Sequence, residues 1–86
     1  MELKIILAKN VKYYRYKKKF TQEHLAECLG VSANYIGRLE RGQHNPALDK
    51  IDKIATILEV QPFELFVERK DYKNLPSRVN LINPKK

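Results

Sequence analysis

The chain has 86 residues and a formal net charge of +7, and 43% of its residues are hydrophobic. A chain of this length can bury one core, so we expect a single domain. One cysteine excludes an internal disulfide, which favours a reducing compartment, and we expect Cys28 to be a small buried residue. The longest apolar run, residues 5–8, is far shorter than the roughly 20 residues of a membrane helix, so we expect a cytoplasmic protein that binds no membrane.

The positive charge gathers at the two ends of the chain. Residues 1–20 carry a formal charge of +6, residues 21–66 carry −3 and residues 67–86 carry +4. A basic excess of this kind indicates a polyanionic partner, although solvated lysines on an ordinary soluble protein give the same totals. Charge alone therefore leaves both interpretations open.

The first predicted element is a helix near the N-terminus. It is expected to end near the lysine run at residues 17–19, because basic side chains suit the negative end of a helix dipole. Its apolar stripe, at spacings of three and four, consists of Leu3, Leu7, Val11 and Tyr14.

Two helix starts and one helix end follow in close succession. Thr21 supplies a hydroxyl N-cap for a second helix over residues 22–29. Gly30 is suited to end this helix because glycine adopts the left-handed conformation readily. Ser32 is the next N-cap, so a third helix begins two residues after the end of the second. A turn this short holds the two helices at a steep angle.

The segment beyond Gly42 predicts a fourth helix, for which Asn45 is the expected N-cap and Pro46 the first helical residue. A fifth, short helix is expected to begin at Pro62 and to offer Phe63 to the core. We therefore expect an all-α domain of five helices. The apolar stripe of the fourth helix consists of Leu48, Ile51, Ile54, Ala55 and Leu58.

The last twenty residues, 67–86, differ in kind from the rest. Two prolines, three asparagines and scattered charge predict an irregular C-terminal arm rather than another packed helix. Val79 and Leu81 nevertheless alternate with polar residues, and Leu3 and Leu7 lie in a similar pattern near the other end. A small two-stranded pairing of the termini, within or between chains, is thus a second interpretation.

The third predicted helix separates into two faces on a helical wheel. Arginine can donate two hydrogen bonds to guanine, asparagine can pair with adenine, and an alanine methyl can pack on thymine. A helical glycine costs about 1 kcal/mol relative to alanine, which two base contacts of about 1–3 kcal/mol each outweigh. A solvated polar face is the alternative. The inner face contains Ser32, Tyr35, Ile36 and Leu39, and the outer face contains Asn34, Gly37, Arg38 and Arg41, with Ala33 at its border.

A resemblance to a known family runs through two stretches, TQEHLAECLGVSANYIGRLERG and NPALDKIDKIATILEVQPFELF. Together they are similar to the Cro/Xre-type, or lambda-repressor-like, helix-turn-helix DNA-binding domains, and the resemblance covers residues 7–66. It implies a five-helix domain whose second and third helices form the motif, with the third in the major groove. We therefore expect residues 1–66 to form the DNA-binding domain and residues 67–86 to form the arm.

The resemblance also implies roles for individual residues. Residues that face base edges are expected to be Ala33, Asn34, Gly37 and Arg38. Residues near DNA phosphates are expected to be Gln22, Ser32 and Arg41, and a structural ion pair is expected between Arg15 and Glu40. In this architecture the lysines at the end of the first helix lie near Gln22, where they contact phosphate or attract DNA from a distance: Lys17, Lys18 and Lys19.

Catalytic and metal-binding patterns are weak in this sequence. His24, Cys28 and His44 are the candidate metal ligands, but structural zinc sites need four ligands and are usually rich in cysteine. No glycine-rich phosphate loop, nucleophile triad or paired carboxylates with a plausible pocket are recognisable. We therefore expect no metal, no cofactor and no enzymatic activity.

These observations predict a sequence-specific double-stranded DNA-binding protein that regulates transcription, as a repressor. The resemblance implies a homodimer that binds a palindromic operator. The alternative is a protein-interaction module, such as an antitoxin or a regulator-binding partner, that acts through residues 67–86. The two functions are compatible with each other.

Overall fold

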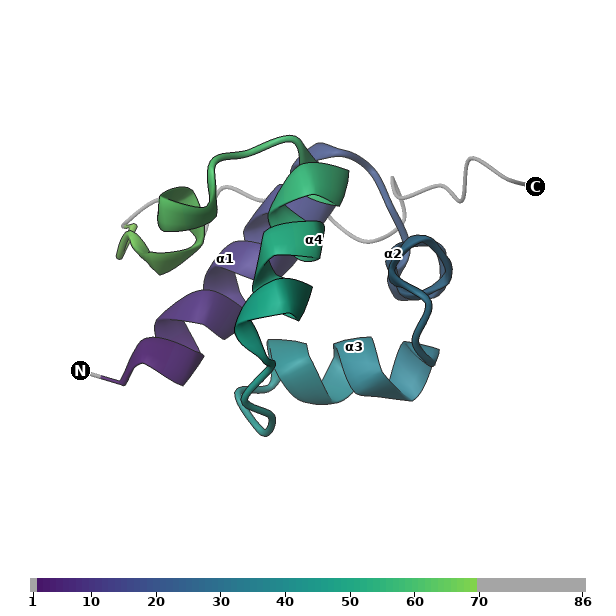
Figure 1. The fold of residues 1–86 in the computed structure, drawn as a ribbon, viewed down its shortest axis with the longest axis horizontal. Helices are drawn as coiled ribbons and strands as arrows, with labels where there is room; N and C mark the ends of the chain where they lie inside the picture. Colours follow the sequence, from purple (N-terminus) through teal and green to yellow (C-terminus); the bar gives the residue numbers. More distant parts are fainter. Residues whose placement is uncertain (1, 70–86) are drawn as a thin grey trace.

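A computed structural model describes residues 2–69 of the chain. Within this range the structure is all-helical, as expected, with four α-helices and a 3₁₀ helix in place of the fifth α-helix. Figure 1 shows α3 crossing below α1 and α4, while α2 is seen end-on beyond the N-terminus of α3. No helix among the described residues is long and apolar enough to cross a membrane. The elements are α1 (Leu3–Lys17), α2 (Gln22–Leu29), α3 (Ala33–Glu40), α4 (Leu48–Leu58) and η1 (Pro62–Phe66).

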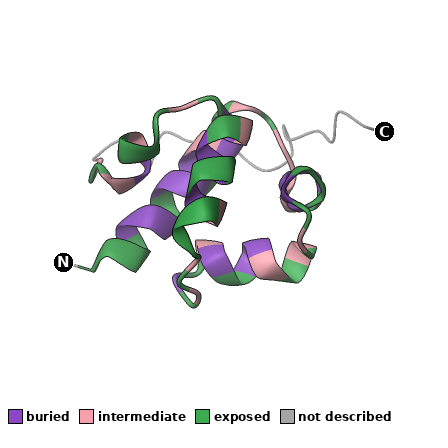
Figure 2. Ribbon diagram, in the orientation of Figure 1, coloured by how far each residue is buried: buried purple, intermediate pink, exposed green. Residues whose placement is uncertain are grey.

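The core lies where the four α-helices and η1 meet. Each α-helix buries most of its apolar stripe and exposes the opposite side, as the colours of Figure 2 show, but Leu3 and Leu48, at the first turns of α1 and α4, are exposed, contrary to the prediction. Burial of a large aliphatic side chain contributes about 1.5–3 kcal/mol, so this cluster is the main source of stability. The fully buried aliphatic side chains are Val11, Leu25, Ile36, Leu39, Ile54 and Leu65.

The start of α2, its end and the start of α3 follow the prediction. Thr21 Oγ1 accepts a hydrogen bond from the His24 backbone N–H at 3.0 Å, and Ser32 Oγ accepts one from the Tyr35 N–H at 3.1 Å. Gly30 adopts φ +80° and ends α2 in the left-handed conformation. Local side-chain and backbone chemistry therefore fixes how α3 leaves α2.

The predicted start of α4 is wrong. The helix begins at Leu48 with Ala47 as its N-cap, and no side chain caps it. Pro46 instead lines an apolar hollow together with Leu3 and Phe66, which belong to α1 and η1. The loop before α4 thus lies beside α1 and η1, and the local cap that the sequence indicated does not form.

The 3₁₀ helix begins at Pro62 as expected, and Glu64 Oε2 accepts a hydrogen bond from the Gln61 backbone N–H at 2.8 Å. Leu65 enters the core, but Phe63 is 67% exposed, so the prediction that Phe63 packs inside is wrong. Phe66 is partly buried against the core, so two of the three apolar residues of this helix pack inside.

The N-terminal part of the predicted strand pairing is also wrong. Residues 3–7 belong to α1, and Leu7 is buried in the core. The helical spacing of the apolar residues therefore decides the structure here, rather than the short alternation of apolar and polar residues. Val79 and Leu81 lie outside the described residues.

The first residues of the predicted arm pack against α1. The Asn10 side chain is fully buried, and its Nδ2 donates to the Leu65 carbonyl at 2.9 Å and to the Val67 carbonyl at 2.8 Å. The Arg69 guanidinium lies 4.2 Å from the centre of the Tyr13 ring, and its Nη2 donates to the Tyr13 hydroxyl at 2.9 Å. Residues 67–69 are thus tied to α1, and the rest of the arm, residues 70–86, lies outside the described part of the chain.

Candidate nucleic-acid interface

The two sides of α3 differ largely as the helical wheel predicted, but Ser32, which the wheel placed on the inner face, is exposed because it lies before the first turn as the N-cap. Ile36 and Leu39 are 0% exposed, while Asn34, Arg38 and Arg41 are exposed. In Figure 1, α3 lies along one edge of the domain, and none of the other described helices covers its outer side. The structure therefore presents one amide and two guanidinium groups on a helix that the core holds from behind.

A buried ion pair anchors the C-terminal end of α3. Arg15 Nε donates to Glu40 Oε2 at 2.7 Å and Arg15 Nη2 to Oε1 at 3.0 Å, in the two-pronged geometry that strengthens such pairs. The two side chains are 4% and 3% exposed. Arg15 Nη1 also donates to the Phe20 carbonyl at 2.8 Å, and Gln22 Nε2 donates to Glu40 Oε1 at 3.0 Å. This network joins α1, the turn that follows it, α2 and α3 at one point.

Gln22 was expected to contact a DNA phosphate, but in the structure its side chain binds Glu40. Its Nε2 is engaged with Glu40, so the amide group that would donate to a phosphate is directed towards the ion pair. The positive N-terminal end of α2 still favours an anion beside Gln22, because helix N-termini present unpaired N–H groups.

Gly37 is not exposed, contrary to the prediction from the wheel. An ideal Cβ on Gly37 would lie 3.1 Å from Arg41 Nη1 and 3.8 Å from Gln22 Oε1, so these two side chains cover the glycine. Helical side chains lean towards the N-terminus of their helix, and Arg41 follows this direction over the space that glycine leaves. Arg41 Nε also donates to Gln43 Oε1 at 3.1 Å. We call the space above Gly37, between the Arg41 and Gln22 side chains, the Gly37 notch.

Gln43 is a residue of this surface that sequence reasoning did not find. It follows the end of α3, outside the helical pattern from which the faces were assigned. In the sequence, the one sign of its contact with Arg41 is that it follows Arg41 by two residues, and this spacing is too common to predict a contact.

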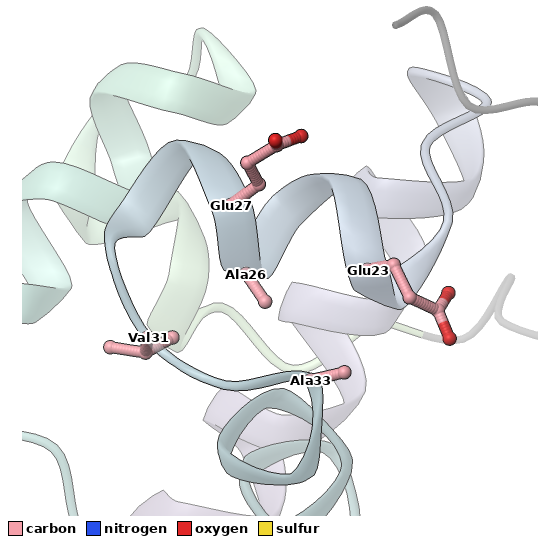
Figure 3. A pocket seen from close by; sticks show the side chains of 5 residues that line it. All are labelled: Glu23, Ala26, Glu27, Val31 and Ala33. Carbon is pink, nitrogen blue, oxygen red and sulfur yellow. The ribbon is translucent and has the colours of Figure 1, made fainter. Parts of the chain in front are cut away.

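Ala33 lies apart from the exposed polar residues of α3. It is partly buried against the core and lines a hollow of about 460 Å³ with residues of α2 and the turn. Figure 3 shows Glu23 and Glu27 on α2 above Ala33, with Ala26 between the two helices. Their carboxylates disfavour a phosphate at this border, which leaves the expected contact of the Ala33 methyl group with a base as a prediction.

The three lysines after α1 point to different places. Lys17 Nζ lies 5.2 Å from the centre of the Tyr13 ring, and Lys18 Nζ forms an ion pair with Glu59 Oε1 at 2.9 Å. Lys19 is exposed in the turn that leads to α2 and has a left-handed φ of 61°. The structure thus separates these side chains, and Lys19 is the lysine best placed beside the N-terminus of α2.

Ser32 and Tyr35 define the first turn of α3. Ser32 is exposed, and its Oγ caps the helix by accepting a hydrogen bond from the Tyr35 N–H. The Tyr35 ring meets the His44 ring edge-on at 4.6 Å and links α3 to the following loop. Burial raises the pKa of the Tyr35 hydroxyl, and the Asp49 carboxylate adds to this effect, so the phenol is neutral at physiological pH.

Cys28 is exposed, so the prediction of a buried cysteine is wrong. It lies at the edge of α2, beside the core-facing Leu25 and Leu29, and its Sγ is 3.6 Å from His24 Nε2. His24 itself is buried against Phe20, with the two ring centres 4.3 Å apart. Among residues 2–69, no group of three or more His, Cys, Asp or Glu side chains is arranged to hold a metal ion.

Comparison with known proteins agrees with this geometry. The helix-turn-helix family model matches residues 11–65. The chain is 35% identical over 66 residues to a Neisseria hypothetical transcription factor from Neisseria meningitidis, and the match covers 77% of this chain and 62% of that protein. It is 41% identical over 58 residues to the control protein C.SmaI of Serratia marcescens, covering 67% and 69% of the two chains. The match to the regulator SlrR of Bacillus subtilis, 36% identical over 62 residues, covers 71% of this chain and 41% of that protein.

Two solved structures share the fold. The hypothetical transcription factor NHTF from Neisseria superposes with a TM-score of 0.76 at 32% identity, covering 87% of this chain and 86% of that one. The restriction-modification controller protein C.AhdI from Aeromonas hydrophila gives a TM-score of 0.69 at 38% identity, covering 73% and 91%. The family match spans the four α-helices from the middle of α1 onward, together with most of η1, and it confirms the resemblance seen in the sequence. This chain therefore belongs to the helix-turn-helix family.

Proposed function

We propose that this protein binds double-stranded DNA in a sequence-specific manner and represses transcription, with α3 in the major groove. The observation that supports this most strongly is the exposed set Asn34, Arg38 and Arg41 on a helix whose other side is fully buried. The major groove is about 12 Å wide and admits such a helix. Relatives described as transcription factors, transcriptional regulators and control proteins support a regulatory role.

Asn34 and Arg38 are the first candidates for base contacts. Asparagine pairs with adenine N6 and N7, and arginine pairs with guanine O6 and N7. Ser32, Gln22 and Lys19 lie near the N-terminal ends of α2 and α3, where helix dipoles favour phosphate. In this arrangement Asn34 and Arg38 supply sequence preference. The three residues near the phosphates supply affinity that does not depend on sequence.

We further propose that two copies bind as a homodimer to a palindromic operator. A helix-turn-helix domain reads one half-site, and two-fold symmetry places the second recognition helix about one turn of DNA away, at 10–10.5 base pairs or roughly 34–36 Å.

The test is selection of preferred sites from random-sequence duplexes by the full chain. We expect one enriched motif with two related half-sites, and an affinity that falls with salt by a log-log slope of about −0.9 for each phosphate contacted. A chain that enriches no motif above the starting library would contradict the proposal.

Two sets of variants then separate the assigned roles. Asn34→Ala and Arg38→Ala should change the preferred base at one position each, whereas Lys19→Ala should weaken binding to all sequences alike. Equal loss on every sequence from both sets would show that the roles are assigned incorrectly.

A further inference from the structure

The central glycine of α3 is covered by an arginine from the next turn. Gly37 costs the helix about 1 kcal/mol relative to alanine. Its place on the outer surface is taken by the guanidinium of Arg41, whose Nη1 lies 3.1 Å from the position of a Cβ on Gly37. Such a distance is tighter than ordinary side-chain contacts, so a Cβ at position 37 forces the guanidinium to shift by a few tenths of an ångström.

The direction of Arg41 determines what it can reach. Arg41 is the C-cap of α3, and from this end an arginine that extends away from the helix reaches towards the phosphates beside the groove. Here the side chain folds back by one turn, about 5.4 Å, to lie over Gly37. Seven residues separate Asn34 from Arg41, which places them within about 20° of each other around the helix. The guanidinium thus lies over the middle of α3, in line with Asn34.

Gln43 holds the guanidinium in this orientation, and Gln22 borders the same space. Gln43 Oε1 accepts a hydrogen bond from Arg41 Nε at 3.1 Å. On the other side of the notch lies the Gln22 carboxamide, which Glu40 holds through a hydrogen bond of 3.0 Å. Within residues 2–69, no hydrogen bond engages the two Nη groups of Arg41. These two groups form the fork that matches guanine O6 and N7.

We propose that Arg41 is a base-reading residue that recognises a guanine in the major groove, and that the Gly37 notch is what positions it. This revises the phosphate role that the family resemblance implied for Arg41, and it rests on the proposed function in DNA binding. Gln43 and Gln22 are positioning residues in this arrangement, because each contacts Arg41 or the space beside it.

The experiment measures affinity for the selected duplex and for every single base-pair variant of one half-site, at one salt concentration. The proteins are the full wild-type chain, Arg41→Lys, Arg41→Ala and Gly37→Ala, each checked for folding by circular dichroism. Lysine keeps the charge of Arg41 but lacks the planar fork, so it separates attraction to phosphate from recognition of guanine.

If Arg41 reads a base, the wild type prefers guanine at one position by about 5- to 150-fold, which is the range of one bidentate contact. Arg41→Lys and Arg41→Ala both lose this preference and keep the preferences at the other positions. Gly37→Ala weakens preference at the same base pair, because the new methyl group displaces the guanidinium. Gln43→Ala does so to a smaller extent, because it removes the hydrogen bond at Arg41 Nε but leaves the space above Gly37 open.

A phosphate role gives the opposite pattern. Arg41→Lys would then keep every base preference, while Arg41→Ala would weaken all duplexes alike and reduce the salt slope by about 0.9. This result, or a Gly37→Ala variant whose preferences all match the wild type, would overturn the proposal. A wild-type chain with no preference at any base pair would instead contradict the proposed function itself.

Discussion

The two sides of α3 carry different kinds of chemistry. The inner side buries Ile36 and Leu39 completely and ends at Glu40, whose carboxylate is held by Arg15 and Gln22. The outer side exposes Asn34 and two arginines, and Arg41 donates a hydrogen bond to Gln43 at the surface. Substitutions on the inner side should therefore change stability, and those on the outer side should change DNA recognition with little effect on stability.

The largest effect is expected from Glu40→Gln, which removes the charge that balances buried Arg15. An unpaired buried charge costs about 3–5 kcal/mol, so the free energy of unfolding measured by urea denaturation should fall by about this amount. The matched control is Glu59→Gln, because Glu59 pairs with Lys18 but its side chain is 74% exposed. An exposed pair contributes about 0–1 kcal/mol. Similar losses in the two variants would show that burial of the Arg15 pair has no special role.

The next largest effect is expected in the core, and it is compared with a substitution of the neighbouring residue on the exposed side of α3. Leu39→Ala opens a cavity in the core and should lower the free energy of unfolding by about 2–5 kcal/mol. Arg38→Ala should change it by no more than about 0.5 kcal/mol, because the side chain is exposed, yet it should alter the preferred operator. Thermal or urea unfolding followed by duplex titration measures both. A destabilised Arg38→Ala variant would remove the distinction between the sides.

The smallest effect concerns the helix caps that set the direction of α3. Ser32→Ala should cost about 1 kcal/mol, because the Tyr35 N–H loses its acceptor. Ala47→Ser should stabilise the protein by up to about 1 kcal/mol, because α4 has no side-chain cap. Both values come from urea denaturation. An Ala47→Ser variant that is less stable than the wild type would indicate that the loop before α4 cannot accommodate a capping hydroxyl.

Local signals explain which parts of the fold could be predicted. Thr21, Gly30 and Ser32 act on backbone groups within a few residues, so the bounds of α2 and the start of α3 follow from the sequence. The start of α4 does not, because no side chain caps it and Pro46 lies in a loop beside α1 and η1. A helix start without a capping side chain gives no local signal in the sequence.

The candidate site shows the same limit at the level of side chains. A helical wheel gives the direction of each Cβ, and it identified Asn34, Arg38 and Arg41 as outward-facing residues. The path of a long arginine side chain depends on several torsions and on its neighbours, so the cover over Gly37 was not predictable. Lys17 and Lys18 diverge for a related reason, since aromatic rings and Glu59 attract them away from α2.

The buried amide of Asn10 also has a consequence for engineering. Asn10 donates hydrogen bonds to one carbonyl in η1 and to one just after it, which fixes the direction of the backbone that follows η1. Arg69 then packs on Tyr13. Tyr13 and Arg15 lie on nearly opposite sides of α1, and Arg15 faces Glu40 of α3. A fluorescent protein or affinity tag joined after this point would start behind the domain, on the side turned away from α3.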